Sequence, residues 1–332
     1  MLVHSSNGIM KSQTATFFDL AQPQLEAVEA QMLRSFDGHH PSLDDALSHL
    51  LSSGGKRIRP TIAILAGKML DVDMEFLILH AAAIEMLHTA TLVHDDLIDG
   101  ALLRRGIPTL NARWSAGATV LTGDYIFARA AYLAAQTGSL ALMESFARTL
   151  MTIVNGEVTQ LFEIEPADLE RSYFDRIYAK TASLFEVSTE GVALIGDCDE
   201  DTIETMRNFG YNIGLAFQIV DDILDFTGDQ ESVGKPVGSD LRQGLLTLPT
   251  LLYLETLEQG AELARSLREQ RVEERELEGI IEHVRTSSAI GRSMQKAQMF
   301  IERGEELLSL MPETPEREAL TDIARYVVRR NL

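Results

Sequence analysis

The chain has little of what would place it in several specialised classes of protein. It has one cysteine, Cys198, which excludes an intramolecular disulfide and a cysteine-rich metal site. It has no run of about 18 to 20 uncharged apolar residues that would span a bilayer, and its N-terminus lacks the basic segment and apolar run of a signal peptide. A Pro/Gly/Ser-rich linker, a fixed-period repeat and a low-complexity tract are also missing. These absences predict a soluble, cytoplasmic protein with no transmembrane segment and a single domain over residues 1–332, of which 1 to about 15 form a flexible leader.

Basic residues are also scarce, and their distribution is uneven. There are 29 Lys and Arg against 50 Asp and Glu, a formal net charge of −21, which argues against nucleic-acid binding because a phosphate backbone would be repelled. The few cations still form two compact clusters, one of Lys56, Arg57 and Arg59 and one of Arg104 and Arg105. Such clusters suit a small anion, although either one alone fits a solvated basic turn equally well.

Strand-like alternation is hard to find, whereas apolar residues recur at helical spacing through most of the chain. A clear example is the run from Ile213 to Leu224, which is followed by the stop signal Thr227-Gly228-Asp229. The 332 residues are 45% apolar, enough for a large core. The pattern predicts an all-α fold of ten or more helices, in which residues 255–310 form exposed amphipathic helices.

The first acidic cluster reads TLVHDDLID over residues 91–99. At about 100° per residue, Asp95 and Asp99 lie one turn apart on one helix face, with His88 about two turns below them, while Asp96 points elsewhere. Two carboxylates at this spacing repel each other unless a cation lies between them, and oxygen-only ligands suit Mg²⁺. A solvated acidic helix end is the alternative for this cluster taken alone.

The second acidic cluster reads FQIVDDILD over residues 217–225 and repeats the same spacing at Asp221, Asp222 and Asp225. Its flanks are apolar, so these carboxylates emerge from a largely buried helix and need a compensating cation or proton. Two such clusters facing each other across a bundle cavity would grip a diphosphate through several metal ions.

Taken in order, the motifs resemble those of the trans-isoprenyl (polyprenyl) diphosphate synthase family of medium- and long-chain type. The resemblance rests on GGKRIRP at 54–60, HTATLVHDDLID at 88–99, Arg104-Arg105-Gly106, GEVTQ at 156–160, Lys180-Thr181 and FQIVDDILD. It implies an antiparallel helix bundle around a deep central cavity, usually in a homodimer. It also implies a prenyltransferase that condenses isopentenyl diphosphate with an allylic prenyl diphosphate, giving all-trans products of about twenty carbons or more.

The resemblance assigns roles to individual residues. Asp95 and Asp99 would bind Mg²⁺ on the allylic diphosphate and Asp221 would hold a further metal, with Asp222 and Asp225 in the same cluster and three Mg²⁺ in each active site. The residues implied to bind substrate are Lys56, Arg59, His88 and Arg105 for isopentenyl diphosphate, Arg104 for the allylic diphosphate, Lys180, Thr181 and Gln218 near the leaving group and the developing cation, and Lys235. Of these, Lys180 and Gln218 join Asp95, Asp99 and Asp221 as the implied catalytic residues.

Product length is expected to depend on Ala90, five residues before Asp95, where the short-chain members of the family carry Phe or Tyr. A small residue there, with Thr91 beside it, places the floor of the cavity deeper, at Leu87 one turn below and at Phe146 from a neighbouring helix.

Two departures from the family pattern are visible. Leu245 stands where a lysine commonly contacts phosphate, so affinity for phosphate is lower or another cation compensates. Gly100 and Ala101 replace acidic residues, while Arg104 and Arg105 keep their spacing. Two other functions are possible. The doubled acidic motif and GGKRIRP argue against a terpene cyclase, and the six retained aspartates argue against a non-catalytic or partner-dependent subunit of a heteromeric synthase.

Overall fold

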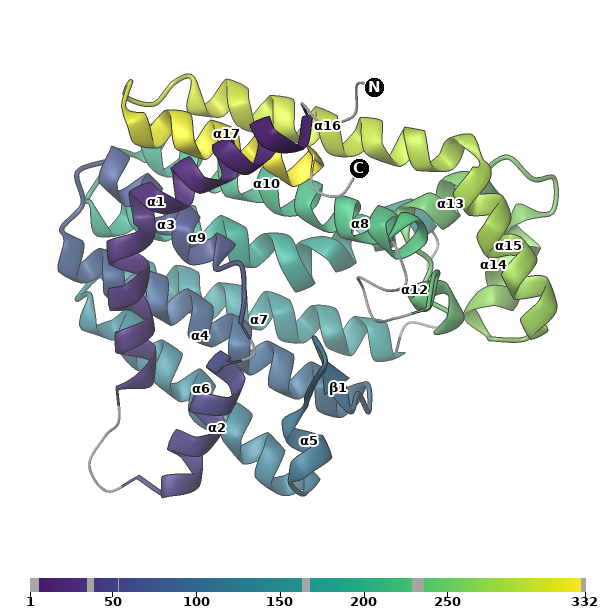
Figure 1. The fold of residues 1–332 in the computed structure, drawn as a ribbon, viewed down its shortest axis with the longest axis horizontal. Helices are drawn as coiled ribbons and strands as arrows, with labels where there is room; N and C mark the ends of the chain where they lie inside the picture. Colours follow the sequence, from purple (N-terminus) through teal and green to yellow (C-terminus); the bar gives the residue numbers. More distant parts are fainter. Residues whose placement is uncertain (1–5, 35–38, 53, 163–167, 229–235, 330–332) are drawn as a thin grey trace. The chain divides into compact units, whose positions relative to one another are not determined.

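The computed structural model of the protein describes all residues except 1–5, 35–38, 53, 163–167, 229–235 and 330–332 (Figure 1). The described chain is almost entirely helical, which confirms the all-α prediction. Two compact units are present. Unit 1 comprises residues 1–150, 184–210 and 307–323, and unit 2 comprises 151–183, 211–306 and 324–332. The prediction of one domain stays a prediction.

The secondary-structure elements that begin in unit 1 are the following. They are α1 Ser6–Leu33, α2 Pro41–Ser52, α3 Ile58–Met69, α4 Met74–Ile98, the antiparallel strands β1 Leu103–Arg104 and β2 Ile107–Pro108, α5 Leu110–Arg113, α6 Ala116–Gln136, α7 Leu140–Phe162, α10 Glu200–Thr227 and α17 Pro315–Arg329. Most of α9 Ser183–Ile195 also belongs to unit 1. Helix α1 therefore begins inside the stretch expected to be a flexible leader.

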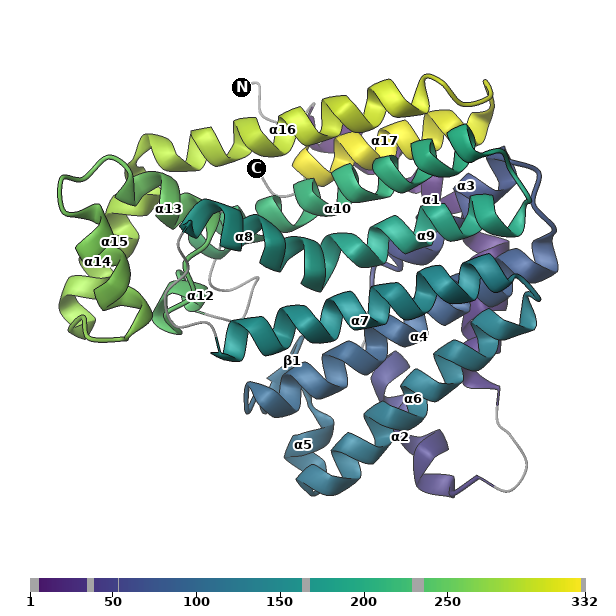
Figure 2. The same ribbon diagram turned by 180° about the vertical axis from the view of Figure 1, so that it is seen from behind.

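Helix α4 is the core helix of unit 1. The Asp73 side chain caps its N-terminus by accepting from the Glu75 amide, and its residues are apolar almost all around. It packs against α6 on one side and against α1 and α3 on the other (Figures 1 and 2). Among the described helices it alone is long and apolar enough to cross a membrane, but 78% of its most apolar window is buried in the fold, as in a core helix.

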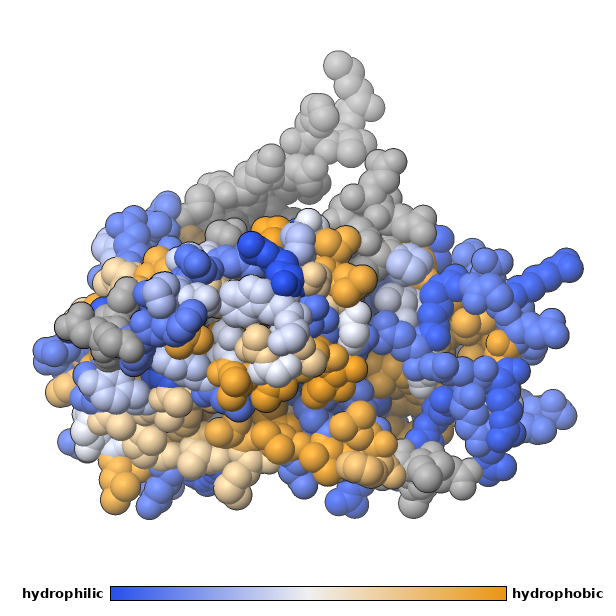
Figure 3. Space-filling model, turned by 90° about the horizontal axis from the view of Figure 1, so that it is seen from below, coloured by the Kyte–Doolittle hydropathy of each residue, from blue (hydrophilic) through white to orange (hydrophobic). Residues whose placement is uncertain are grey.

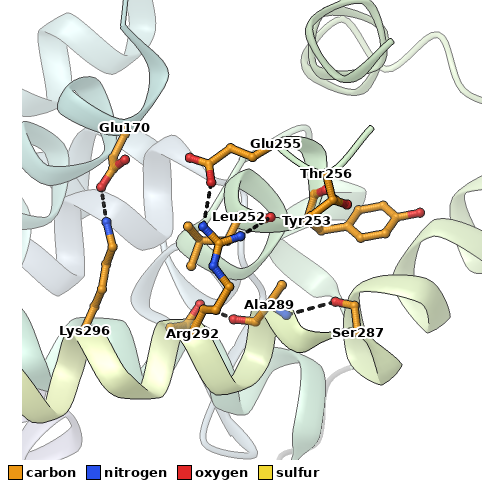
Figure 4. A network of polar contacts seen from close by, with 10 residues as sticks. Glu170, Leu252, Tyr253, Glu255, Thr256, Ser287, Ala289, Arg292 and Lys296 are labelled. Carbon is orange, nitrogen blue, oxygen red and sulfur yellow. Dashed lines mark hydrogen bonds and ion pairs between the residues drawn. The ribbon is translucent and has the colours of Figure 1, made fainter. Parts of the chain in front are cut away.

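Unit 2 contains the remaining elements: α8 Leu169–Ile177, the π-helical turn η1 Tyr178–Ala182, α12 Ser239–Arg242, α13 Leu248–Leu254, α14 Gly260–Arg268, α15 Glu274–Thr286 and most of α16 Ser288–Leu308. Figure 4 shows how α16 is attached to α8 and α13. Lys296 pairs with Glu170, and Arg292 donates to the Leu252 carbonyl (3.0 Å) and to Glu255 (2.8 Å).

Several local predictions are confirmed. Helix α10 ends at Thr227, where the Thr-Gly-Asp signal predicted a stop. The stretch expected to be amphipathic contains α15, whose buried residues Leu277, Ile280, Ile281 and Val284 follow helical spacing on one face. The exposed strand pair 103–108, which was not predicted, is a short hairpin between helices and carries the second basic cluster.

Candidate active site

The first basic cluster lies on a tight turn that leads into α3. Gly54 and Arg57 have positive φ values of 66° and 46°, so the chain turns sharply before the helix starts. Arg57 holds this turn in place because its guanidinium donates to Glu85 at 2.7 Å and to Glu29 at 3.1 Å. Glu85 is buried in α4, so the turn that carries Lys56 and Arg59 is attached to the core helix.

His88, in α4, is influenced by the charges of both basic clusters. Burial lowers the pKa of His88 well below its ordinary value, and the charges of Arg59, Arg104, Arg105 and Arg57 lower it further. His88 is therefore a neutral imidazole among guanidinium groups. Arg59 stacks over the Phe185 ring at 4.7 Å.

The hairpin is joined to the same turn. Arg105, whose φ is 52°, donates to the Gly54 carbonyl, and a side chain at Gly55 would lie 3.3 Å from the Arg105 guanidinium. Two basic clusters that lie about fifty residues apart in the sequence thus meet in space. This concentration of positive charge in an acidic protein suits a small anion.

The first acidic cluster ends α4 beside these cations. Asp95 is half-buried and Asp99 is exposed at the C-cap. Asp96 is buried and accepts three hydrogen bonds from Arg104, at 2.8, 2.9 and 3.0 Å. The charge of Asp96 is thus paired with that of Arg104 within the fold.

The second acidic cluster is held by a hydrogen-bonded network in unit 2. Asp222 is buried, and its two oxygens accept from the Tyr173 hydroxyl at 2.7 Å and from the Gln218 amide at 2.8 Å. Burial raises the pKa of Asp222 to about 7, while the hydrogen bonds from Gln218 and Tyr173 and the charge of Arg176 lower it and Asp240 raises it. Burial and the adjacent carboxylate raise the pKa of Tyr173 well above its usual value, so the phenol stays protonated and donates.

Lys180 and Thr181 lie on the π turn η1, a conformation that often occurs at functional sites. Thr181 donates to the Gln218 carbonyl oxygen at 2.7 Å, and Lys180 pairs with Glu157 at 2.9 Å. Gly156 permits this turn to approach α7, because a Cβ at that position would lie 2.4 Å from the Ala179 Cβ. The motifs GEVTQ, Lys180-Thr181 and FQIVDDILD therefore meet in one network.

The other two aspartates of the second acidic cluster are less buried than Asp222. Asp221 and Asp225 are half-buried, and Asp225 accepts from the Asp240 amide at 3.2 Å. Arg176 stacks over the Tyr173 ring and donates to the Leu246 carbonyl at 2.7 Å. Sequence reasoning missed Tyr173, Arg176 and Asp240, since each acts through tertiary contacts that helical spacing does not reveal.

The structure leaves other predicted roles untested. Ala90, Leu87 and Phe146 are buried, and Thr91 donates to the His88 carbonyl of its own helix. Lys235 lies outside the described residues. Among the residues that are described, no three Asp, Glu, His or Cys side chains converge closely enough to hold a metal by themselves. The two acidic clusters belong to different units, so their joint metal site stays a prediction.

Comparisons with known proteins agree with this description. Residues 40–284 match the model of the polyprenyl synthetase family. The chain is 38% identical over 315 residues to heptaprenyl diphosphate synthase component 2 of Geobacillus stearothermophilus, covering 95% of this chain and 98% of that one. It is 35% identical to octaprenyl diphosphate synthase of Escherichia coli, with 94% and 98% covered. A crystal structure of decaprenyl diphosphate synthase from Rhodobacter capsulatus superposes with a TM-score of 0.87 at 32% identity, over 96% of this chain and 99% of that chain.

Proposed function

We propose the function of this chain from one premise, which is that it belongs to the polyprenyl synthetase family. It is a trans-polyprenyl diphosphate synthase, a prenyltransferase of isoprenoid biosynthesis that forms longer prenyl chains. The substrates we propose are isopentenyl diphosphate and an allylic prenyl diphosphate, and the product has about twenty carbons or more. The relatives named for heptaprenyl, octaprenyl and decaprenyl products support this length. The observation that carries the proposal is the meeting of the two basic clusters, where Arg105 donates to the Gly54 carbonyl, while Arg104 pairs with Asp96 at the acidic end of α4.

Enzymes of this family generally depend on Mg²⁺, and the donors here fit that ion. Asp95 and Asp99 offer oxygen ligands from one helix face and leave coordination positions for phosphate oxygens. We place three Mg²⁺ per active site, held by Asp95, Asp99 and Asp221 with Asp225 nearby. When bound, the ions neutralise charge on the allylic diphosphate and on the pyrophosphate that leaves.

The residues of the chain itself bind, orient and protect the reactants. Arg59, Arg105, His88 and Lys56 bind the isopentenyl diphosphate, and Arg104 and Lys180 bind the diphosphate that departs. Ionisation leaves an allylic cation, the isopentenyl double bond attacks it, and the proton lost from the new chain passes to the released pyrophosphate. Apolar side chains exclude water, which would otherwise capture the cation. No side chain serves as a nucleophile.

Self-association is the second part of the proposal. The last turns of α7 carry an apolar stripe at helical spacing, each member at least 46% exposed: Met151, Val154, Val158, Leu161 and Phe162. Helix α6, in unit 1, separately carries exposed Val120, Leu121 and Tyr132. Figure 3 shows hydrophobic residues, in orange, at the surface of the molecule. A patch of this kind favours burial against another chain. We propose a second copy of this chain as the occupant.

A partner-dependent role is the competing proposal, because one relative is named heptaprenyl diphosphate synthase component 2, which implies a second component for that protein. Light scattering of the purified chain distinguishes the two: a homodimer is expected, converted to a monomer by Met151→Glu with Val158→Glu. A wild-type monomer would contradict self-association. We further propose a cytoplasmic location, which the acidic surface and the burial of α4 support.

The activity itself is tested with the purified wild-type chain, Mg²⁺, labelled isopentenyl diphosphate and an allylic primer, with product length read by mass spectrometry. Longer prenyl diphosphates are expected, and none after chelation of the metal. Failure of the chain alone, followed by activity with a second protein, would favour the partner-dependent reading.

The metal assignment has its own test. Asp95→Ala and Asp221→Ala should each lower turnover by a factor on the order of 10² or more while leaving the circular dichroism spectrum intact. Near-normal turnover in either variant would contradict the assignment of that aspartate.

A further inference from the structure

Four side chains of unit 2 form one hydrogen-bonded chain that joins the α8–η1 segment to α10. Tyr173 donates to Asp222 (2.7 Å), Gln218 donates to the other oxygen of Asp222 (2.8 Å), and Thr181 donates to Gln218 (2.7 Å). Tyr173 is 1% exposed and Asp222 is 3% exposed, so water competes little for these bonds. Sequence reasoning assigned Asp222 to a metal and gave Tyr173 no role.

The π turn explains why both ends of this chain reach α10. Tyr173 and Thr181 lie eight residues apart, which in a regular α-helix would separate them by about 80° around the axis. The wider π turn between them takes up part of that angle. Gln218 and Asp222 lie one turn apart on α10, and the two segments are thus joined at two neighbouring points.

Each hydrogen bond in this series also has a fixed donor and acceptor. Both oxygens of Asp222 accept, so Gln218 must present its NH₂ group to Asp222 and its carbonyl oxygen to Thr181. The single hydroxyl proton of Thr181 is then donated to the Gln218 carbonyl oxygen. What Thr181 offers to the rest of the site is its oxygen lone pairs, which favour a developing positive charge and not a phosphate oxygen.

We propose that Tyr173 is a positioning residue that acts through Asp222 to fix the Gln218 amide and thereby point the Thr181 lone pairs at the allylic cation. In this assignment Asp222 orients the Gln218 amide and is not a metal ligand. The proposal rests on the proposed prenyl transfer and on the roles near the developing cation that the family resemblance implies for Thr181 and Gln218. Arg176 supports the arrangement by stacking on the Tyr173 ring while it is anchored on the Leu246 carbonyl.

The main test compares Tyr173→Phe with wild type. This variant keeps the ring and removes only the hydroxyl, so we expect kcat to fall about tenfold, with the KM of both substrates and the half-saturating Mg²⁺ concentration within twofold of wild type. Tyr253→Phe is the matched control, because Tyr253 lies in the same unit, stacks on His283 and takes no part in the hydrogen bonds that join Tyr173 to Thr181. An unchanged kcat in Tyr173→Phe would overturn the proposal.

Asp222→Asn supplies the second test, because an amide has a single accepting oxygen, so either the bond from Tyr173 or the bond from Gln218 must reverse its direction. We expect a larger loss of kcat, with the half-saturating Mg²⁺ concentration unchanged, and the double variant with Tyr173→Phe no slower than Asp222→Asn alone. A tenfold rise in the Mg²⁺ requirement, restored by excess Mg²⁺, would make Asp222 a metal ligand and overturn the proposal. A wild-type chain without prenyl transfer would contradict the proposed function instead, so the two failures are distinguishable.

Discussion

His80 lies in α4 with no exposed surface, and its Nε2 atom is bonded to the Ser188 carbonyl at 3.2 Å. Its Nδ1 atom has no hydrogen-bond partner among the described residues. Burial lowers the pKa of His80 from 6.5 to about 4, against the smaller opposing effect of the Ser188 and Val187 backbone. The neutral imidazole is therefore the form that the folded core accepts.

This shift makes stability depend on pH. Between about pH 4 and 6.5 the unfolded chain binds a proton at His80 that the folded chain does not, so the free energy of unfolding falls as the pH falls through this window. At pH 5 the loss relative to pH 7 is about 2 kcal/mol from this residue. Urea unfolding at both pH values should show a smaller loss for His80→Gln than for wild type. Equal losses in the two proteins would contradict the assignment.

Among single residues, the sequence alone locates the acidic and basic clusters but not the partners that hold them in place. The positions of Arg59, His88, Arg104 and Asp96 follow from motif spacing on and beside one helix. The bonds from Tyr173 to Asp222 and from Arg57 to Glu85 join residues 49 and 28 positions apart, and they depend on how helices cross. No periodicity in the sequence encodes those crossings.

Secondary-structure elements were predicted well where a local sequence signal determines them, and poorly where tertiary packing determines their geometry. The end of α10 at Thr227 follows from the Gly that comes after it. The π turn at 178–182 was not predicted, because YAKTA has the composition of an ordinary helix. Its wider geometry depends on the contact of Ala179 with Gly156 and on the bond from Thr181 to Gln218.

Helices α9 and α10 cross closely at Gly210, which gives a prediction about stability. A Cβ there would lie 2.4 Å from both the Phe185 carbonyl oxygen and the Thr189 hydroxyl, and Thr189 cannot turn away without losing its bond to the Met206 carbonyl. Gly210→Ala should therefore lower the free energy of unfolding by about 1 to 3 kcal/mol. The measurement is the unfolding midpoint in urea or on heating.

Gly291 provides the matched control for this substitution. It lies within α16, and a Cβ there would meet nothing within 4 Å. Gly291→Ala should raise the free energy of unfolding by about 0.5 to 1 kcal/mol, since alanine is the better helix former. If both variants changed stability in the same direction, the close crossing at Gly210 would not be the cause.

For the whole molecule, fold class and family were accessible from the sequence because periodicity and an ordered set of motifs are one-dimensional signals. Product length is a different kind of property, because it depends on the volume left between helices. Ala90 is fully buried in α4, about 7.5 Å along the helix from Asp95, and Leu87 and Phe146 are buried as well. We propose that the growing prenyl tail passes Ala90, with Leu87 and Phe146 at the floor.

Ala90→Phe should then shorten the product towards about fifteen carbons, because the ring fills the space that the tail needs and touches no diphosphate ligand. The KM for the primer should stay close to the wild-type value. Ala81→Phe is the matched control, since Ala81 is equally buried but lies about 180° around α4 from Ala90. It should lower the melting temperature by overpacking the core without shortening the product. If Ala90→Phe instead lowered the melting temperature and gave the wild-type product distribution by mass spectrometry, Ala90 would be ordinary core and the tail would follow another route.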